Sequence, residues 1–173
     1  METDMERLFD KAVEDRNVKM ILTEMRRDRC QSAEVQKYGC DALFRTVQHN
    51  AAAAREAASL GVFQDVASAI NAFSGHIDLC TEACTAVWRI MREGGFSISR
   101  AALEQGAFDC LKKVMDGHPE GSAPNESALL ALECLADHGL ISFERSPQMQ
   151  ELQQQKHKGK AFAKILIVPE RGF

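Results

Sequence analysis

Residues 79–91 read Leu-Cys-Thr-Glu-Ala-Cys-Thr-Ala-Val-Trp-Arg-Ile-Met. Apolar and small residues recur in this stretch at steps of three and four, which predicts an amphipathic helix. Nearly the same stripe occurs 44 residues earlier, at 35–47, and 45 residues later, at 128–136. Three copies of one helix at a near-constant spacing indicate a repeat protein.

Glycines mark equivalent turns in two of the predicted units. Gly61 and Gly106 are 45 residues apart, and a new apolar stripe begins just after each, at Phe63 and Phe108. Each unit therefore reads as a short helix, a second helix and a long third helix. We expect both glycines to adopt a positive φ, which glycine tolerates best. The pattern predicts an all-α fold, an α-solenoid of about three three-helix repeats.

The turn of the third unit resembles a known repeat family. Ala101-Ala102-Leu103-Glu104-Gln105 followed by Gly106-Ala107-Phe108 resembles the armadillo repeat, in which a short first helix ends in a Gly-Ala turn. Residues 83–87 and 39–43 are similar to the core of that family's third helix, which is rich in small residues. The resemblance implies a right-handed, armadillo-like superhelix. HEAT repeats are the alternative, but they have two helices per unit, and the glycine turns favour three.

The charge is spread unevenly along the 173 residues. From Glu144 onward six Lys and Arg outnumber three Asp and Glu, although the whole chain carries a net charge of −4. A chain of this length is enough for one domain with its own core. We predict an armadillo-like repeat domain over residues 1–143 and a basic tail over 144–173. The tail is expected to contain a polar helix at 148–156 and a flexible apolar segment at 162–168.

Several classes of function are disfavoured by composition. An acidic body argues against nucleic-acid binding, which needs a basic surface. No apolar run approaches the ~20 residues of a membrane span, and Met1–Glu6 lacks the apolar core of a secretory signal. The six cysteines contain no Cys-x-x-Cys pair. We therefore expect reduced thiols in a cytoplasmic or nuclear protein.

No catalytic, cofactor or metal site stands out in the sequence. His76, Cys80 and Cys84 follow one another at four-residue steps, as ligands of a soft metal could on one helix face. Buried structural thiols are the preferred interpretation, because Cys84 aligns with Cys40 and Leu129 at a core position of the repeat. We expect no cofactor, no metal and no enzymatic activity. A thiol-dependent enzyme is the alternative from a different functional class.

Armadillo proteins that bind extended peptides use a Trp and an Asn, one turn apart, on each third helix. By the resemblance, the Trp positions of this chain hold Asp41, Thr85 and Leu130. The Asn positions hold Arg45, Arg89 and Cys134. The Trp/Asn array is thus absent, and recognition of basic import signals is not expected.

Aromatic and basic residues take equivalent places on the first two long helices, as Phe44-Arg45 and Trp88-Arg89. We expect a non-catalytic adaptor or scaffold that binds an acidic peptide or protein in the concave groove. The predicted partner-binding residues are Lys37, Asp41, Phe44, Arg45, Thr85, Trp88, Arg89, Arg92 and Glu133. The alternative functions are self-association through an open end of the array and a role as a regulatory subunit of a larger complex. The alternative for Arg45 and Arg89 is that both are solvated charges without a binding role.

Overall fold

The computed structural model of the chain describes residues 3–145 and 163–167. Within these residues, every regular element up to Asp137 is an α-helix, which confirms the expected all-α class for this part. None of the described helices is both long enough and apolar enough to cross a membrane. The helices are α1 (Asp4–Glu14), α2 (Val18–Asp28), α3 (Ala33–Val47), α4 (Ala51–Ser59), α5 (Val62–Ala72), α6 (Ile77–Glu104), α7 (Ala107–Gly117) and α8 (Ala123–Asp137).

Short polar side chains begin the N-terminal helices. Thr3 and Glu6 form a capping box at α1, in which each side chain bonds to the other residue's backbone N–H. Asn17 and Asn50 each accept a hydrogen bond from the backbone N–H three residues later, at the starts of α2 and α4. These bonds satisfy N–H groups that have no partner inside the helix. Local sequence chemistry therefore fixes where these helices start.

Left-handed backbone conformations separate successive helices. Gly61 and Gly106 both have φ +83°, immediately before α5 and α7, which confirms the predicted positive-φ turns. Arg16 stands 45 residues before Gly61 and also has a positive φ, of 50°. Gly95, with φ 72° and ψ −160°, breaks α6 into two helical parts. The third set of helices thus begins after Gly95.

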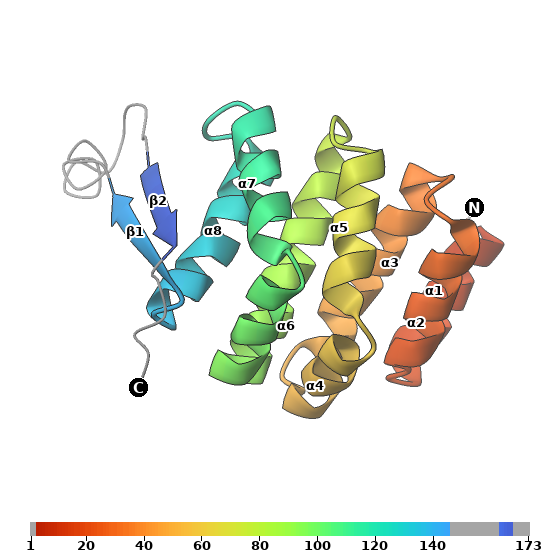
Figure 1. The fold of residues 1–173 in the computed structure, drawn as a ribbon. Coiled ribbons are helices and arrows are strands. Elements are labelled where there is room, and N and C mark those ends of the chain that lie inside the picture. Colours follow the sequence, from red (N-terminus) through yellow and green to blue (C-terminus); the bar gives the residue numbers. More distant parts are fainter. Residues whose placement is uncertain (1–2, 146–162, 168–173) are drawn as a thin grey trace.

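The helices fall into three successive groups along the molecule (Figure 1). The first group is α1, α2 and α3; the second is α4, α5 and the part of α6 before Gly95; the third is the rest of α6 with α7 and α8. The long helices α3, α6 and α8 pack side by side. We call residues 4–137 the helical stack, with its N-terminal end at α1–α3 and its C-terminal end at α8.

Buried positions on the long helices recur at a spacing of 44. Every buried residue of α3, from Gln36 to Val47, has a buried counterpart 44 residues later in α6. The same spacing relates α6 to α8, so Cys84 corresponds to buried Ala128. The predicted alignment with Leu129 is one residue out, and Leu129 is only half-buried. The consecutive apolar residues of α8 allow either register in the sequence, and packing selects one.

Two short strands follow the helical stack. β1 (Ile141–Arg145) and β2 (Ala163–Ile167) pair antiparallel, with Ile141 opposite Ile167, and β1 packs against α8. β1 crosses the predicted boundary between 143 and 144, while the predicted apolar segment of the tail contributes β2. The division into two domains stays a prediction. The predicted polar helix at 148–156 lies outside the described residues.

Candidate partner-binding face

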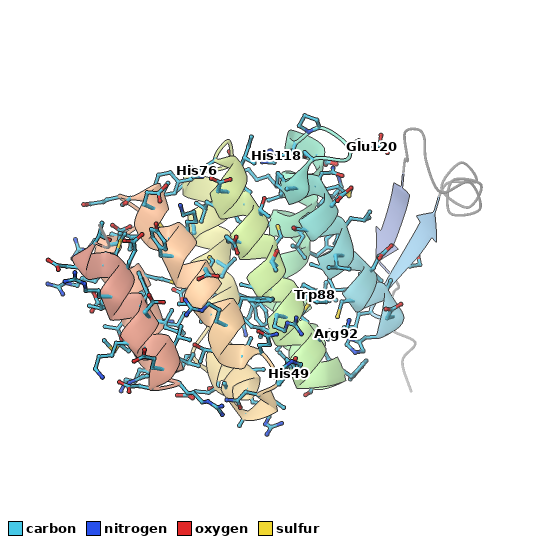
Figure 2. The ribbon with its side chains drawn as sticks, turned by 180° about the vertical axis from the view of Figure 1, so that it is seen from behind. His49, His76, Trp88, Arg92, His118 and Glu120 are labelled. Atoms are coloured by element: carbon cyan, nitrogen blue, oxygen red, sulfur yellow. The ribbon has the colours of Figure 1, made fainter. Side chains whose placement is uncertain are left out.

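Four of the predicted site residues meet where α3 and α6 run side by side. The Arg89 guanidinium lies 4.9 Å from the centre of the Phe44 ring and 4.6 Å from that of the Trp88 ring. The Arg92 guanidinium lies 5.4 Å from the centre of the Trp88 ring, and Figure 2 shows these two side chains next to each other. We call Phe44, Trp88, Arg89 and Arg92 the aromatic–arginine cluster.

Helix geometry explains how the cluster assembles. Trp88 and Arg92 are four residues apart on α6, so their side chains lie on the same helix face. Phe44 stands 44 residues before Trp88, at the same level of the neighbouring helix α3, because buried positions of the two helices share that spacing. The rings therefore face a common strip of surface, and each cation–π contact within it contributes about 0.5–1 kcal/mol where solvent is present.

The two arginines of the cluster differ in their exposure and in whether they already form an ion pair within the protein. Arg89 lies 3.3 Å from the Glu93 carboxylate, and its side chain is only 14% exposed. Its Nε is buried and has no hydrogen-bond partner among the described residues. Arg92 is exposed and forms no ion pair with any side chain of the described part. Arg89 therefore acts as a fixed spacer between rings, whereas Arg92 presents an available cation.

The charged residues predicted on α3 have partners within the molecule. Arg45 lies 2.6 Å from Asp10 of α1 and 3.5 Å from Asp41. Lys37 lies 2.6 Å from Glu34, one turn earlier. The structure thus brings Arg45 to α1 and does not bring it to the aromatic–arginine cluster. An ion pair to a partner carboxylate at Arg45 would have to compete with Asp10.

The remaining predicted residues lie toward α8. The Thr85 hydroxyl donates to the backbone carbonyl of Thr81 and lies 3.3 Å from the Ser127 hydroxyl of α8. The contact with Ser127 links α6 to α8, so Thr85 contributes to the packing of these two helices. Glu133 lies half-buried on α8.

The N-terminal half of α6 contains an acidic region that the sequence did not predict. Burial raises the pKa of Glu82, and the nearby carboxylates of Asp41 and Asp78 raise it further. The face therefore has two halves, one acidic around Glu82 and one formed by the aromatic–arginine cluster. The sequence aligns Asp41 with Thr85 of α6. The burial of Glu82 could not be predicted, because it results from the packing of α3 on α6.

The cysteines are largely buried, as predicted, except Cys30, which is half-buried at the end of α2. Cys30 escapes burial because it lies in the left-handed turn between α2 and α3. Burial raises the pKa of Cys110 to about 12, so this thiol is protonated and unreactive at neutral pH. His76 caps α6, where its Nδ1 accepts from the Leu79 N–H. No group of three or more His, Cys, Asp or Glu within the described residues could hold a metal ion.

Comparison of the chain with models of protein families, with curated proteins and with solved structures finds no match.

Proposed function

We propose that the chain is a non-catalytic adaptor that binds a segment of a partner protein on the face formed by α3, α6 and α8. We interpret this face as the concave surface of an armadillo-like solenoid. The 44-residue spacing of buried positions and the turns at Gly61 and Gly106 support that interpretation. Solenoids of this kind offer long concave surfaces and commonly use them for binding.

The aromatic–arginine cluster carries the proposal. Trp88 is half-buried, so it keeps part of a large apolar ring available for contact. Tryptophan and arginine are the residue types that most often dominate interface energies, since they combine contact area with directed hydrogen bonds. Arg89 holds its place through Glu93 and the two rings. Ordering of the cluster in the free protein lowers the entropy loss on binding.

The charges of the face define the ligand and its direction. The Arg92 guanidinium can form two parallel hydrogen bonds to a carboxylate, and Trp88 beside it can cover an apolar side chain. We therefore propose a peptide that carries an acidic residue next to an apolar one. The acidic region around Glu82 repels a carboxylate at the other end of the face, so the ligand's acidic end points toward Arg92.

Selection from a random peptide library displayed on phage tests this function. We expect the wild-type protein to enrich sequences with an apolar residue beside Asp or Glu. Arg92→Glu and Trp88→Ala should lose that enrichment, since the first repels the carboxylate and the second removes the ring. Arg55→Glu, at an exposed arginine of α4, is the matched charge-reversal control and should enrich the same motif as the wild type. Enrichment of one motif by all four proteins would reject the face as the binding site.

A further inference from the structure

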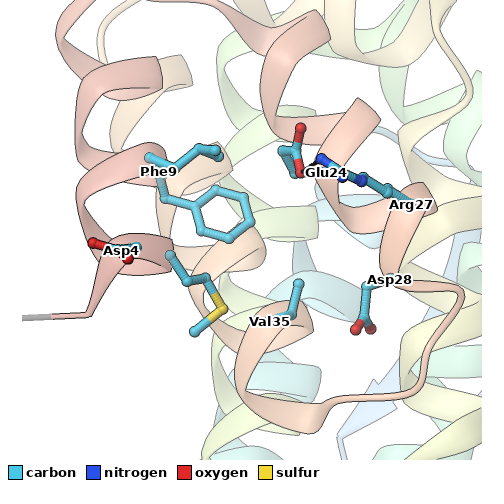
Figure 3. Close-up of a pocket in the computed structure, with 8 residues that line it drawn as sticks. Asp4, Phe9, Glu24, Arg27, Asp28 and Val35 are labelled. Carbon is cyan, nitrogen blue, oxygen red and sulfur yellow. Dashed lines mark ion pairs between the residues drawn. The ribbon is translucent and has the colours of Figure 1, made fainter.

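A pocket of about 440 Å³ opens between α1, α2 and α3 at the N-terminal end of the helical stack (Figure 3). Its apolar lining comes from Met5, Leu8, Phe9 and Val35. Figure 3 shows Phe9 reaching from α1 toward α2, which carries Glu24, Arg27 and Asp28. The aromatic–arginine cluster contributes nothing to this pocket, so it is a separate surface.

The charges of the pocket are predominantly negative. Among the described lining residues, Asp4, Glu24 and Asp28 supply three carboxylates against the guanidinium of Arg27, which lies 3.7 Å from Glu24. Arg7, outside the lining, lies 3.6 Å from the exposed Asp4. Among the described residues, the hydrogen-bond donors to Asp28 are uncharged, namely two backbone N–H groups and the Gln36 side-chain amide. A negative charge beside apolar surface favours a ligand that combines apolar and basic groups.

The positions equivalent to the pocket residues in the next two groups of helices are covered by neighbouring helices. Glu24 corresponds, at steps of 45, to Ala69 and Val114, which are both buried. Leu8 is half-buried, whereas its counterpart Ala53 is buried. In the second group these positions lie on α4 and α5, against which α2 and α3 pack. The first group has no preceding helices in the described chain, so the pocket occupies the place where a helix would lie.

We infer that this pocket docks an amphipathic helix of a partner protein, with Lys or Arg flanking its apolar residues. The pocket takes one or two apolar side chains of that helix, and Glu24 and Asp4 face its basic residues. Docking through the α8 end of a second copy is disfavoured, because it would bring the exposed Asp137 toward the pocket's carboxylates. This inference is independent of the proposed peptide-binding face.

The test uses a defined probe, an amphipathic helical peptide of about 15 residues made of Leu and Lys, and its Leu/Glu counterpart. Amide shifts in NMR spectra of the full chain locate binding, and calorimetry measures affinity. We expect the Lys peptide to shift amides of α1, α2 and α3, and the Glu peptide to bind about tenfold more weakly. Glu24→Lys should weaken the Lys peptide about tenfold, Glu24→Gln by less, and the exposed α4 control Glu56→Lys by no more than about twofold.

Thermal melting of each variant shows whether it is folded, and the partly exposed position of Glu24 favours folding of both substitutions. Shifts centred outside α1–α3 would overturn the inference, and so would equal affinity of folded Glu24→Lys and wild type. Sedimentation without peptide provides a further check. A mass that rises with concentration, and no longer does so in Glu24→Lys, would overturn the inference in favour of a second copy as the occupant.

Discussion

The two ends of the helical stack leave different surfaces uncovered. At the N-terminal end, Glu24 stands where the later groups bury Ala69 and Val114. At the C-terminal end, Leu130 is 42% exposed, although its counterparts Ala42 and Ala86 are buried. The N-terminal end thus has a charged side chain where the later groups have apolar core, and the C-terminal end exposes an apolar side chain where the earlier groups bury one.

The exposure of Leu130 also shows which neighbouring group of helices covers the equivalent residues Ala42 and Ala86. Ala42 lies in the first described group and is buried, whereas Leu130 lies in the last described group of helices and is exposed. The cover at this position therefore comes from the following group of helices. A residue's environment thus depends on its place in the stack as well as on its place in its own helix.

The largest effect on stability should come from placing a charge at the position that Ala42, Ala86 and Leu130 share. Ala86→Glu buries an unpaired carboxylate under α8, and we expect it to destabilise the protein by about 3–5 kcal/mol. Leu130→Glu, at the uncovered counterpart, should change the free energy of unfolding by no more than about 0.5–1 kcal/mol. Urea denaturation measures both. Similar losses for the two variants would show that the following group does not provide the cover.

The glycine turns give the next effect. Gly106→Val forces a β-branched residue into a positive φ, and we expect a loss of about 2–3 kcal/mol, more than the ~1 kcal/mol typical of helix propensity. The N-terminal group already has Arg16 at the equivalent place, with a positive φ. Arg16→Gly should therefore be neutral or stabilise by up to about 1 kcal/mol. A Gly106→Val protein that unfolds at the wild-type denaturant concentration would contradict the turn.

A smaller effect should follow from loss of an ion pair at the N-terminal end. Arg26 joins α2 to α5 through two nitrogens bonded to Asp65, and it also donates to the Leu60 carbonyl. Because Arg26 is half-exposed, Arg26→Ala should destabilise by only about 1 kcal/mol and by less in high salt. Arg27→Ala, which loses only an exposed 3.7 Å pair, is the control and should have almost no effect. A salt-independent loss would show that packing of the Arg26 stem dominates.

The smallest effects concern two glutamates with opposite pKa shifts. Hydrogen bonds from Thr3 and Tyr38 lower the pKa of Glu6, whereas burial raises that of Glu82. The ionised Glu6 therefore stabilises the fold at pH 7, and this stabilisation is lost as the pH falls through its folded pKa. The ionised Glu82 destabilises at pH 7, and that penalty disappears as the pH falls below its unfolded pKa, about 4.3.

Melting temperatures across pH 3–7 measure both groups. Glu6→Gln should melt slightly below the wild type at pH 7, and Glu82→Gln slightly above it. Both differences should vanish in acid. A Glu82→Gln protein that melts below the wild type at pH 7 would mean that the carboxylate has a stabilising partner.

Local signals in the sequence predict most of the helical stack. The 3.6-residue stripes and the glycines that require positive φ depend only on near neighbours, so the starts of α5 and α7 were predictable. The register of α8 was not, because its consecutive apolar residues fit two alignments. The pairing of β1 with β2 joins segments about 22 residues apart and leaves no local signature.

The candidate site was predicted in part for the same reason. The spacing of Phe44 and Trp88 places two aromatics at equivalent levels, and Arg89 with Glu93 is a four-residue pair that the sequence displays. Asp10 as the partner of Arg45 was not predictable, since it comes from a different helix 35 residues away. The N-terminal pocket was not predictable either, because residues of α1, α2 and α3 form it together and their arrangement depends on how the helices assemble.

The fluorescence of Trp88, the only tryptophan in the chain, tests the central claim most directly. A peptide enriched by the wild-type protein in the display selection is titrated into it, while calorimetry follows binding independently. We expect a saturable blue shift of the emission and weaker quenching by acrylamide, because the ligand covers the half-buried ring. Saturable binding with unchanged emission and quenching would place the ligand elsewhere and rule out Trp88 as its contact.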